Sequence, residues 1–154
     1  VMQTPAGCAI SGRAITLSTA GVVPGIYKYI ESGLPYRLAF SVTSAIAEKR
    51  GKVMPIERTH PLPELIEAIR HYTRVREERA MVAYVAIKGF NTGKEDAEAL
   101  KRAFEGIPIK LDLIDVTDPT GKYEPPDEAE LKAFRDHLQI LGCPLRGATR
   151  AARR

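Results

Sequence analysis

The stretch MVAYVAI, residues 81–87, indicates the fold class because it is an unbroken run of apolar residues rich in β-branched and aromatic side chains. Such a run is typical of a strand in a parallel sheet, where neither face is simply solvated. Three further runs of the same kind are predicted to form strands, at residues 14–18, 37–43 and 109–116. The chain is therefore expected to contain about four strands.

Amphipathic helices are predicted between and after these strands, over residues 61–79, 95–105 and 127–141. In each of them the apolar residues recur at the three- and four-residue spacing of one helical face. Asp127 is placed to cap the last helix, and Gly142 is placed to end it. The segments before the last strand are long enough to cross from one strand to the next.

The alternation of strands and helices predicts an α/β fold of about four parallel βα units, either as an open sheet or as part of a (βα) barrel. Four units cannot close a barrel, so no strands would oppose the inner face of the sheet. Exposed apolar side chains there would cost roughly 1.5–3 kcal/mol each. We therefore expect that face to be filled by a missing N-terminal half or by a second copy of the chain. The alternative is a rearrangement of the helices into an open doubly wound sheet.

The composition is that of an ordinary globular domain, with 154 residues, 44% apolar and 27% charged. No apolar run approaches the roughly 18 residues of a membrane span, so we expect no membrane association and a cytoplasmic location. Cys8 and Cys143 have no partner at metal-ligand spacing, which predicts neither a metal site nor a disulfide framework. Much of the net charge of +4 comes from an arginine-rich tail, residues 143–154, which is predicted to be disordered.

Polar side chains follow each predicted strand. Because the carboxyl ends of parallel strands form one ligand face, these strand exits are the candidate site. The first two exits are rich in hydroxyl groups and small residues, which lets a polar ligand approach backbone N–H groups. The third is typical of a plain turn over residues 89–93. The four exits are residues 18–21, 41–44, 88–91 and 115–118.

The fourth exit carries three carboxylates, on Asp112, Asp115 and Asp118. A bound cation or a hydroxyl-bearing ligand is one interpretation of this group, and an exposed loop that binds nothing is the other. The sequence contains neither the P-loop nor the GxGxxG pattern, which excludes nucleotide binding by those motifs.

Five stretches occur in an order and spacing that resemble a known enzyme family. The chain resembles the radical S-adenosylmethionine (SAM) methyltransferases of the RlmN and Cfr type, which modify an adenosine of large-subunit ribosomal RNA. The resemblance extends over about residues 10–142. The stretches are ITLSTAGVVPGI (15–26), LAFSVTSA (38–45), MPIER (54–58), AYVAIKGFN (83–91) and KLDLIDV (110–116).

The resemblance implies a (βα)6 partial barrel, of which residues 1–142 supply the last four units. It implies SAM as cofactor, with a 4Fe–4S cluster held by a CxxxCxxC loop in the preceding half. Since this chain has no such loop, it is not expected to be active alone. RNA is an implied partner, as is the missing N-terminal half.

The resemblance also implies the residues that contact SAM. Ser18 corresponds to the serine of the family's ST-x-G stretch, and Ser41, Val42 and Thr43 correspond to its Ser-Leu-His stretch. Thr117 stands where the family has an asparagine in the last loop. These five residues are the predicted cofactor-binding set, and neither a catalytic residue nor a metal ligand is assigned.

The residues at the ligand face differ from the family pattern more than the scaffold does. Thr43 replaces a histidine, Ala83 replaces a glutamate, and Asp112 and Asp115 replace an asparagine and a proline. The reactive cysteine near the family's C-terminus also has no equivalent, because Cys143 lies too early. Three functions follow from this pattern.

The first function is a radical SAM enzyme whose substrate has diverged from ribosomal RNA. The second is a ribosomal-RNA adenosine methyltransferase, and the third is a non-catalytic half-barrel that binds RNA or another partner. A CxxxCxxC motif upstream of Val1 would favour the first two functions, and its absence would favour the third.

Overall fold

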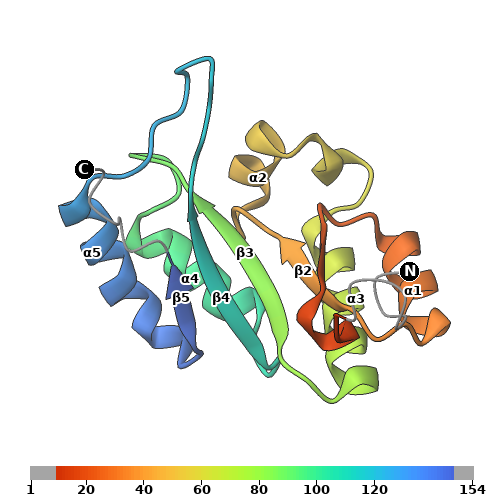
Figure 1. Ribbon diagram of the computed structural model, residues 1–154. Helices are drawn as coiled ribbons and strands as arrows, with labels where there is room; N and C mark the ends of the chain where they lie inside the picture. The colour runs from red at the N-terminus through yellow and green to blue at the C-terminus, as the bar shows by residue number, and fades with distance from the viewer. Residues whose placement is uncertain (1–9, 148–154) are drawn as a thin grey trace.

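One five-stranded sheet organises residues 10–147, the part of the chain that the computed structural model describes (Figure 1). The strands are all parallel and cross the sheet in the order of the sequence. They are β1 (Thr16–Thr19), β2 (Arg37–Ser41), β3 (Ala80–Ala86), β4 (Ile109–Asp115) and β5 (Leu145–Gly147).

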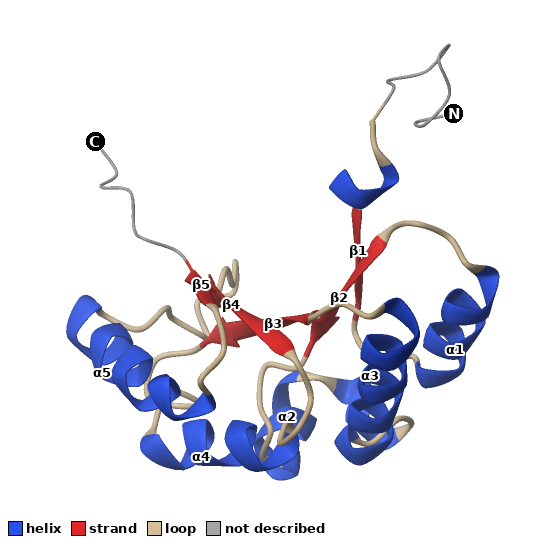
Figure 2. Cartoon of the chain, turned by 90° about the horizontal axis from the view of Figure 1, so that it is seen from below, coloured by secondary structure: helices blue, strands red, loops and turns tan. Residues whose placement is uncertain are grey.

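The α-helices all pack on the same face of this sheet, as Figure 2 shows. They are α1 (Val23–Ser32), α2 (Ala47–Val53), α3 (Leu62–Arg76), α4 (Lys94–Ala103) and α5 (Glu128–Leu138). Short 3-10 turns lie at η1 (Gly12–Ala14), η2 (Pro55–Arg58) and η3 (Gln139–Leu141).

The predicted α/β class is confirmed, and the arrangement is that of an arc of a barrel. A doubly wound sheet reverses its strand order and carries helices on both faces. Here the order is sequential and the helices lie on one side (Figure 2). The three predicted helices are present as α3, α4 and α5, and Asp127 caps α5 by accepting a hydrogen bond from the Glu130 amide at 2.8 Å. The helices α1 and α2 were not predicted.

Burial alternates along the central strands. In β3 every second residue is buried on the helix-covered face, while Met81, Ala83 and Val85 are only half-buried. The expectation of strands shielded on both faces is therefore wrong for this part of the chain. The core lies between sheet and helices, and its largest members include Phe40, Tyr72, Tyr84, Leu111 and Phe134.

No α-helix among residues 10–147 covers the other face of the sheet (Figure 2). Residues paired in parallel register share a face, so the residues on this open face form rows across the strands. One row contains Ser18, Ala39, Met81 and Lys110, and the next contains Ser41, Ala83, Asp112 and Arg146. The predicted open inner face is thus present, but it is more polar than expected.

The tail differs in part from the prediction of disorder after residue 142. Leu145–Gly147 forms β5, which pairs with β4 in parallel at the edge of the sheet. Residues 148–154 lie outside the described part of the chain.

Candidate functional site

Two predicted site residues, Ser18 and Ser41, lie near the carboxyl ends of neighbouring parallel strands. Ser18 pairs with Ala39, and Ser41 lies two residues further along β2, so both side chains belong to the open face. Ser18 is exposed and Ser41 is half-buried. Neither hydroxyl makes a hydrogen bond to another residue within 10–147.

Thr43 follows β2 in a strained backbone conformation. Its φ is +57°, and the Ser44 amide donates to the Val42 carbonyl across it at 2.6 Å. A hydrogen bond from residue i+2 to residue i around a positive φ is the mark of the rare γ-turn. For a β-branched residue such a backbone costs about 1–3 kcal/mol, and strain of this size is concentrated at functional sites.

The other two predicted cofactor contacts are placed differently. The Val42 side chain is fully buried in the core on the helix-covered face, so only its backbone can face a ligand. Thr117 is exposed in the loop after β4, on the far side of β3 from the exit of β2. The structure therefore groups Ser18, Ser41 and Thr43, and it sets Val42 and Thr117 apart from them.

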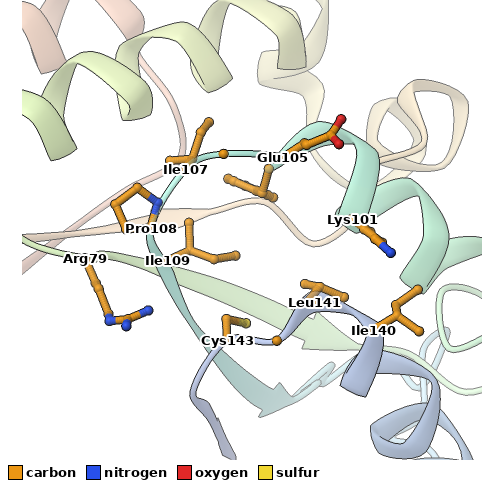
Figure 3. A pocket seen from close by; sticks show the side chains of 12 residues that line it. Arg79, Lys101, Glu105, Ile107, Pro108, Ile109, Ile140, Leu141 and Cys143 are labelled. Atoms are coloured by element: carbon orange, nitrogen blue, oxygen red, sulfur yellow. The ribbon is translucent and has the colours of Figure 1, made fainter.

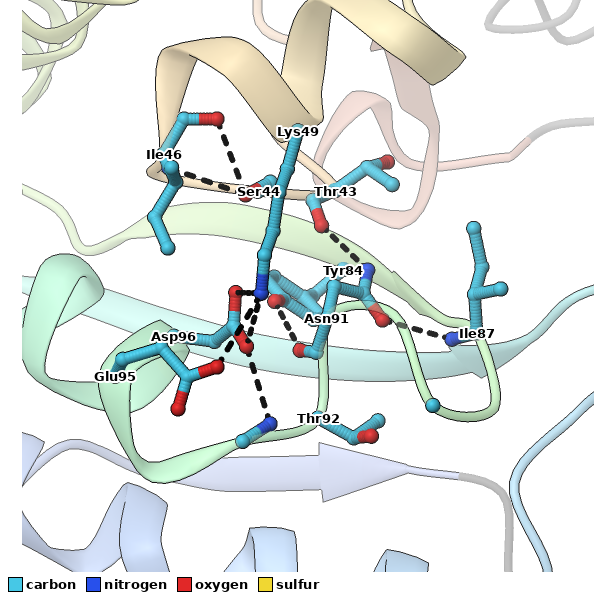
Figure 4. Close-up of polar contacts among 12 residues, drawn as sticks. Thr43, Ser44, Ile46, Lys49, Tyr84, Ile87, Asn91, Thr92, Glu95 and Asp96 are labelled. Atoms are coloured by element: carbon cyan, nitrogen blue, oxygen red, sulfur yellow. Dashed lines mark hydrogen bonds and ion pairs between the residues drawn. The ribbon is translucent and has the colours of Figure 1, made fainter.

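Asn91 is a site residue that the sequence analysis missed, because residues 89–93 were interpreted as a plain turn. Its side chain is fully buried. The carboxamide Nδ2 donates to the carbonyls of Thr43 at 2.7 Å and Val85 at 2.8 Å, while Oδ1 accepts from the Ile87 amide at 2.8 Å (Figure 4). Two carbonyls and one amide require two donors and one acceptor, which fixes the orientation of the carboxamide.

Tyr84 supports Asn91 from within β3. Its hydroxyl donates to the Asn91 carbonyl at 2.6 Å. Burial raises the pKa of Tyr84, and the nearby carboxylates of Asp96 and Glu95 raise that pKa further. Tyr84 therefore stays a neutral donor. The loop after β3 is held both through the Asn91 carboxamide and through the Asn91 backbone carbonyl.

Lys49 connects α2 to the start of α4 on the outer side of the same loops (Figure 4). Its ammonium lies 2.9 Å from Oδ2 and 3.0 Å from Oδ1 of Asp96, whose side chain is 1% exposed. Asp96 also accepts from the Gly93 amide at 3.1 Å. The segments after β2 and β3 are thus tied together by a buried carboxylate as well as by Asn91.

Arg50 is a second residue that the sequence analysis missed. Its side chain is fully buried, and it pairs with Glu57 and donates to the carbonyl of Ala20 at 3.2 Å. Ala20 directly follows β1, so a cation from α2 holds the first strand exit. A charged residue in a short helix without an apolar stripe is expected to be exposed, so no sequence pattern indicated this role.

A separate pocket of about 400 Å³ lies at the opposite, amino-terminal edge of the strands, between the starts of β3 and β4, the end of α4 and η3 (Figure 3). It contains Cys143, whose thiol pKa is raised by burial. A raised pKa lowers the fraction of reactive thiolate, so this cysteine is not set up as a nucleophile. The pocket takes no part in the strand-exit site.

The three aspartates near the exit of β4 do not converge. Asp112 and Asp115 lie on opposite faces of β4, and Asp118 accepts hydrogen bonds from the Thr120 hydroxyl at 2.7 Å and the Tyr123 amide at 3.0 Å. These hydrogen bonds lower the pKa of Asp118, and the bond from the Thr120 hydroxyl has the largest effect. Within residues 10–147 no group of three histidine, cysteine or acidic residues is arranged to hold a metal ion, and no helix is long and apolar enough to cross a bilayer.

The chain is similar to known proteins over most of its length. A probable RNA methyltransferase of Myxococcus xanthus (strain DK1622) is 72% identical over 145 residues, which cover 94% of this chain and 40% of that protein. A dual-specificity RNA methyltransferase RlmN of Jannaschia sp. (strain CCS1) is 38% identical over 92% of this chain and 36% of its own length. The chain is homologous to a region of the RlmN-type RNA methyltransferases.

A solved structure is also similar to this chain. The crystal structure of a radical SAM methyltransferase from Sphaerobacter thermophilus superposes with a TM-score of 0.89 at 28% identity, over 96% of this chain and 43% of that one. No family model matches the chain. Since the chain spans about 40% of the length of the RlmN-type relatives that it matches, it corresponds to part of such a protein.

Proposed function

We propose that this chain forms the part of a radical SAM methyltransferase that holds SAM at the carboxyl ends of β1 and β2. The observation that carries the proposal is the pair of hydroxyls on Ser18 and Ser41, which lie on the open face at neighbouring strand ends and make no hydrogen bond within residues 10–147. The strained turn at Thr43 lies beside them. The matching structure of a radical SAM methyltransferase supports SAM as the ligand.

The residues at these exits fit the polar groups of SAM. Hydroxyls both donate and accept hydrogen bonds, so Ser18 and Ser41 suit its carboxylate, amino and ribose groups. Thr43 is buried, and its part in the site is the backbone turn beside these serines. Val42 takes part only through its backbone carbonyl, because its amide donates to the Ala83 carbonyl at 3.0 Å, and Thr117 contributes from the loop after β4. Bound SAM supplies the methyl group and the radical chemistry, while the residues of this chain bind and orient it.

The described residues do not fit the iron–sulfur cluster of such enzymes. Cluster ligands are cysteine thiolates, and Cys143 is the one cysteine within residues 10–147. It lies at the amino-terminal edge of the strands, away from Ser18 and Ser41. We assign the cluster ligands to another part of the complete gene product, and we derive no step through the cluster for this chain.

RNA is the proposed substrate class. The relatives at 72% and 52% identity are both named probable RNA methyltransferases. An assay under reducing, anaerobic conditions with the complete gene product and ribosomal RNA separates the alternatives. A methylated adenosine in large-subunit RNA identifies the family's substrate, and methylation of another RNA indicates a diverged one. If the SAM-loaded protein transfers no methyl group to any RNA, the result indicates a non-catalytic binding module.

Binding of SAM is the direct test of the site. In equilibrium dialysis with the cluster-reconstituted complete protein, Ser18→Ala and Ser41→Ala should each weaken binding, since one lost hydrogen bond costs about 0.5–1.5 kcal/mol. Thr16→Ala is the matched control because Thr16 lies on the same strand and face, two residues before Ser18. Equal binding by all four proteins would contradict the proposed site.

A further inference from the structure

We propose that Asn91 is the positioning residue of the SAM site, an inference that rests on the proposed function. Asn91 does not lie at the ligand face. It is buried behind it, and its carboxamide reaches from the loop after β3 to the Thr43 carbonyl after β2 (Figure 4). It thereby keeps Thr43 in the γ-turn that presents residues 41–43 to the ligand.

The first step of the argument is that the γ-turn does not hold itself. A β-branched residue at φ +57° leaves that backbone unless other contacts keep it there. The bond from the Ser44 amide to the Val42 carbonyl closes the turn, but it leaves the Thr43 carbonyl, a buried acceptor, to be satisfied from outside. Asn91 Nδ2 is the donor that satisfies it, at 2.7 Å.

The second step is that Asn91 is itself rigidly held. Its Nδ2 also donates to the Val85 carbonyl, and its Oδ1 accepts a hydrogen bond from the Ile87 amide. The backbone carbonyl of Asn91 accepts a hydrogen bond from the Tyr84 hydroxyl. The carboxamide therefore has no alternative partner to turn to. A donor fixed in this way to β3 transmits the position of that strand to the exit of β2.

The third step is that neither a charged nor a shorter side chain supplies the two donors and one acceptor that this position requires. Aspartate has the shape of asparagine but would put carboxylate oxygens against the carbonyls of Thr43 and Val85, where donors are required. Alanine removes the contact altogether. Serine keeps one donor and one acceptor, so it retains part of the network and is the variant best able to fold.

The test measures SAM binding by the cluster-reconstituted complete protein. Asn91→Ala should weaken binding by about tenfold or more and Asn91→Ser by a smaller factor. The reason is that residues 41–43, once displaced, lose their hydrogen bonds to SAM. Thr73→Val is the matched control, since Thr73 is buried in α3 and its hydroxyl also donates to one backbone carbonyl, that of Arg70. It should lower stability and leave SAM affinity within about twofold.

A second variant separates positioning from general stability. Glycine adopts positive φ without strain. In a Thr43→Gly background the turn therefore no longer needs the hydrogen bond from Asn91 to stay in place. There the effect of Asn91→Ala on SAM affinity should shrink to about threefold or less. Hydrogen exchange at the Ser44 amide supplies a readout without ligand, and it should speed up in Asn91→Ala and not in Thr73→Val.

The outcomes distinguish this inference from the proposed function. If the wild-type protein binds SAM but Asn91→Ala and Asn91→Ser change affinity no more than Thr73→Val does, Asn91 has only a structural role. An equal loss of SAM affinity from Asn91→Ala in the wild-type and Thr43→Gly backgrounds would also contradict the claim that Asn91 holds the turn at Thr43. If the wild-type protein fails to bind SAM at all, the proposed function falls and takes the ligand-positioning role of Asn91 with it.

Discussion

Arg50 and Ala20 are joined across thirty residues of sequence by a hydrogen bond of 3.2 Å, from the guanidinium Nη2 to the carbonyl oxygen. The same guanidinium pairs through Nη1 with Glu57, whose carboxylate also accepts from the Leu62 amide at 3.1 Å. One buried cation therefore connects the exit of β1 to the first turn of α3. The carbonyl that it holds, that of Ala20, lies two residues after Ser18 of β1.

Replacement of Arg50 should be among the most destabilising single changes in this chain. Arg50→Met leaves Glu57, which is 11% exposed, without its cation, and breaking a buried pair in this way costs about 3–5 kcal/mol. Urea unfolding followed by circular dichroism measures the loss. Lys52→Ala is the control, because its pair with Glu48 is exposed on the same helix and is worth no more than about 0.5 kcal/mol. Similar losses for both variants would contradict this account of Arg50.

Alkaline pH should destabilise the fold through Tyr72. Burial, followed by the hydrogen bond to Glu78, raises the pKa of Tyr72 to about 12. A pKa raised in the folded state means that its stability contribution is complete below about pH 10 and is lost as the pH rises towards 12. Tyr72→Phe should therefore lose less stability than wild type over this interval, while exposed Tyr27→Phe should follow wild type. Parallel curves for wild type and Tyr72→Phe would exclude this role.

Two glycines should respond to alanine in opposite directions. A Cβ on Gly147 would lie 2.8 Å from Leu113 Cβ and 3.2 Å from its carbonyl oxygen, so β5 would have to move away from β4. Gly147→Ala should cost about 1–3 kcal/mol. Gly51 lies inside α2, where a Cβ meets only Glu57 Cγ at 3.9 Å, so Gly51→Ala should stabilise by about 0.5–1 kcal/mol. Thermal unfolding of both variants checks the two signs.

The predictable part of the fold came from long apolar runs and from regular helical stripes. Residues 81–87 and 109–116 correspond to β3 and β4, and the stripe of α3 is the buried face that contains Leu65, Ile69 and Tyr72. Helix α1 was missed because Pro24 and Gly25 are typical turn residues, although proline fits the first turn of a helix. Helix α2 buries only Arg50 and so has no apolar stripe to detect.

The candidate site was predictable only where it depends on strand order. Parallel neighbours bring Ser18 and Ser41 to one edge, which the sequence analysis anticipated from the strands alone. The contact between Asn91 and Thr43 spans 48 residues, and no local pattern reports a hydrogen bond of that range. Likewise, the positive φ of Thr43 depends on tertiary contacts, because threonine by itself disfavours it.

The open face makes a last prediction about the 154-residue chain on its own. Val85 and Ile114 pair in register on that face, and Ile114 is 42% exposed. Covering such a side chain is worth about 1.5–3 kcal/mol, so the isolated chain is expected to self-associate through this face. Ile114→Lys should shift light scattering of a dilution series towards the monomer. Ile140→Lys, at a residue of η3 that is 44% exposed at the other edge, should not. A wild-type monomer at every dilution would show that the polar rows around Ile114 suffice to keep the face solvated.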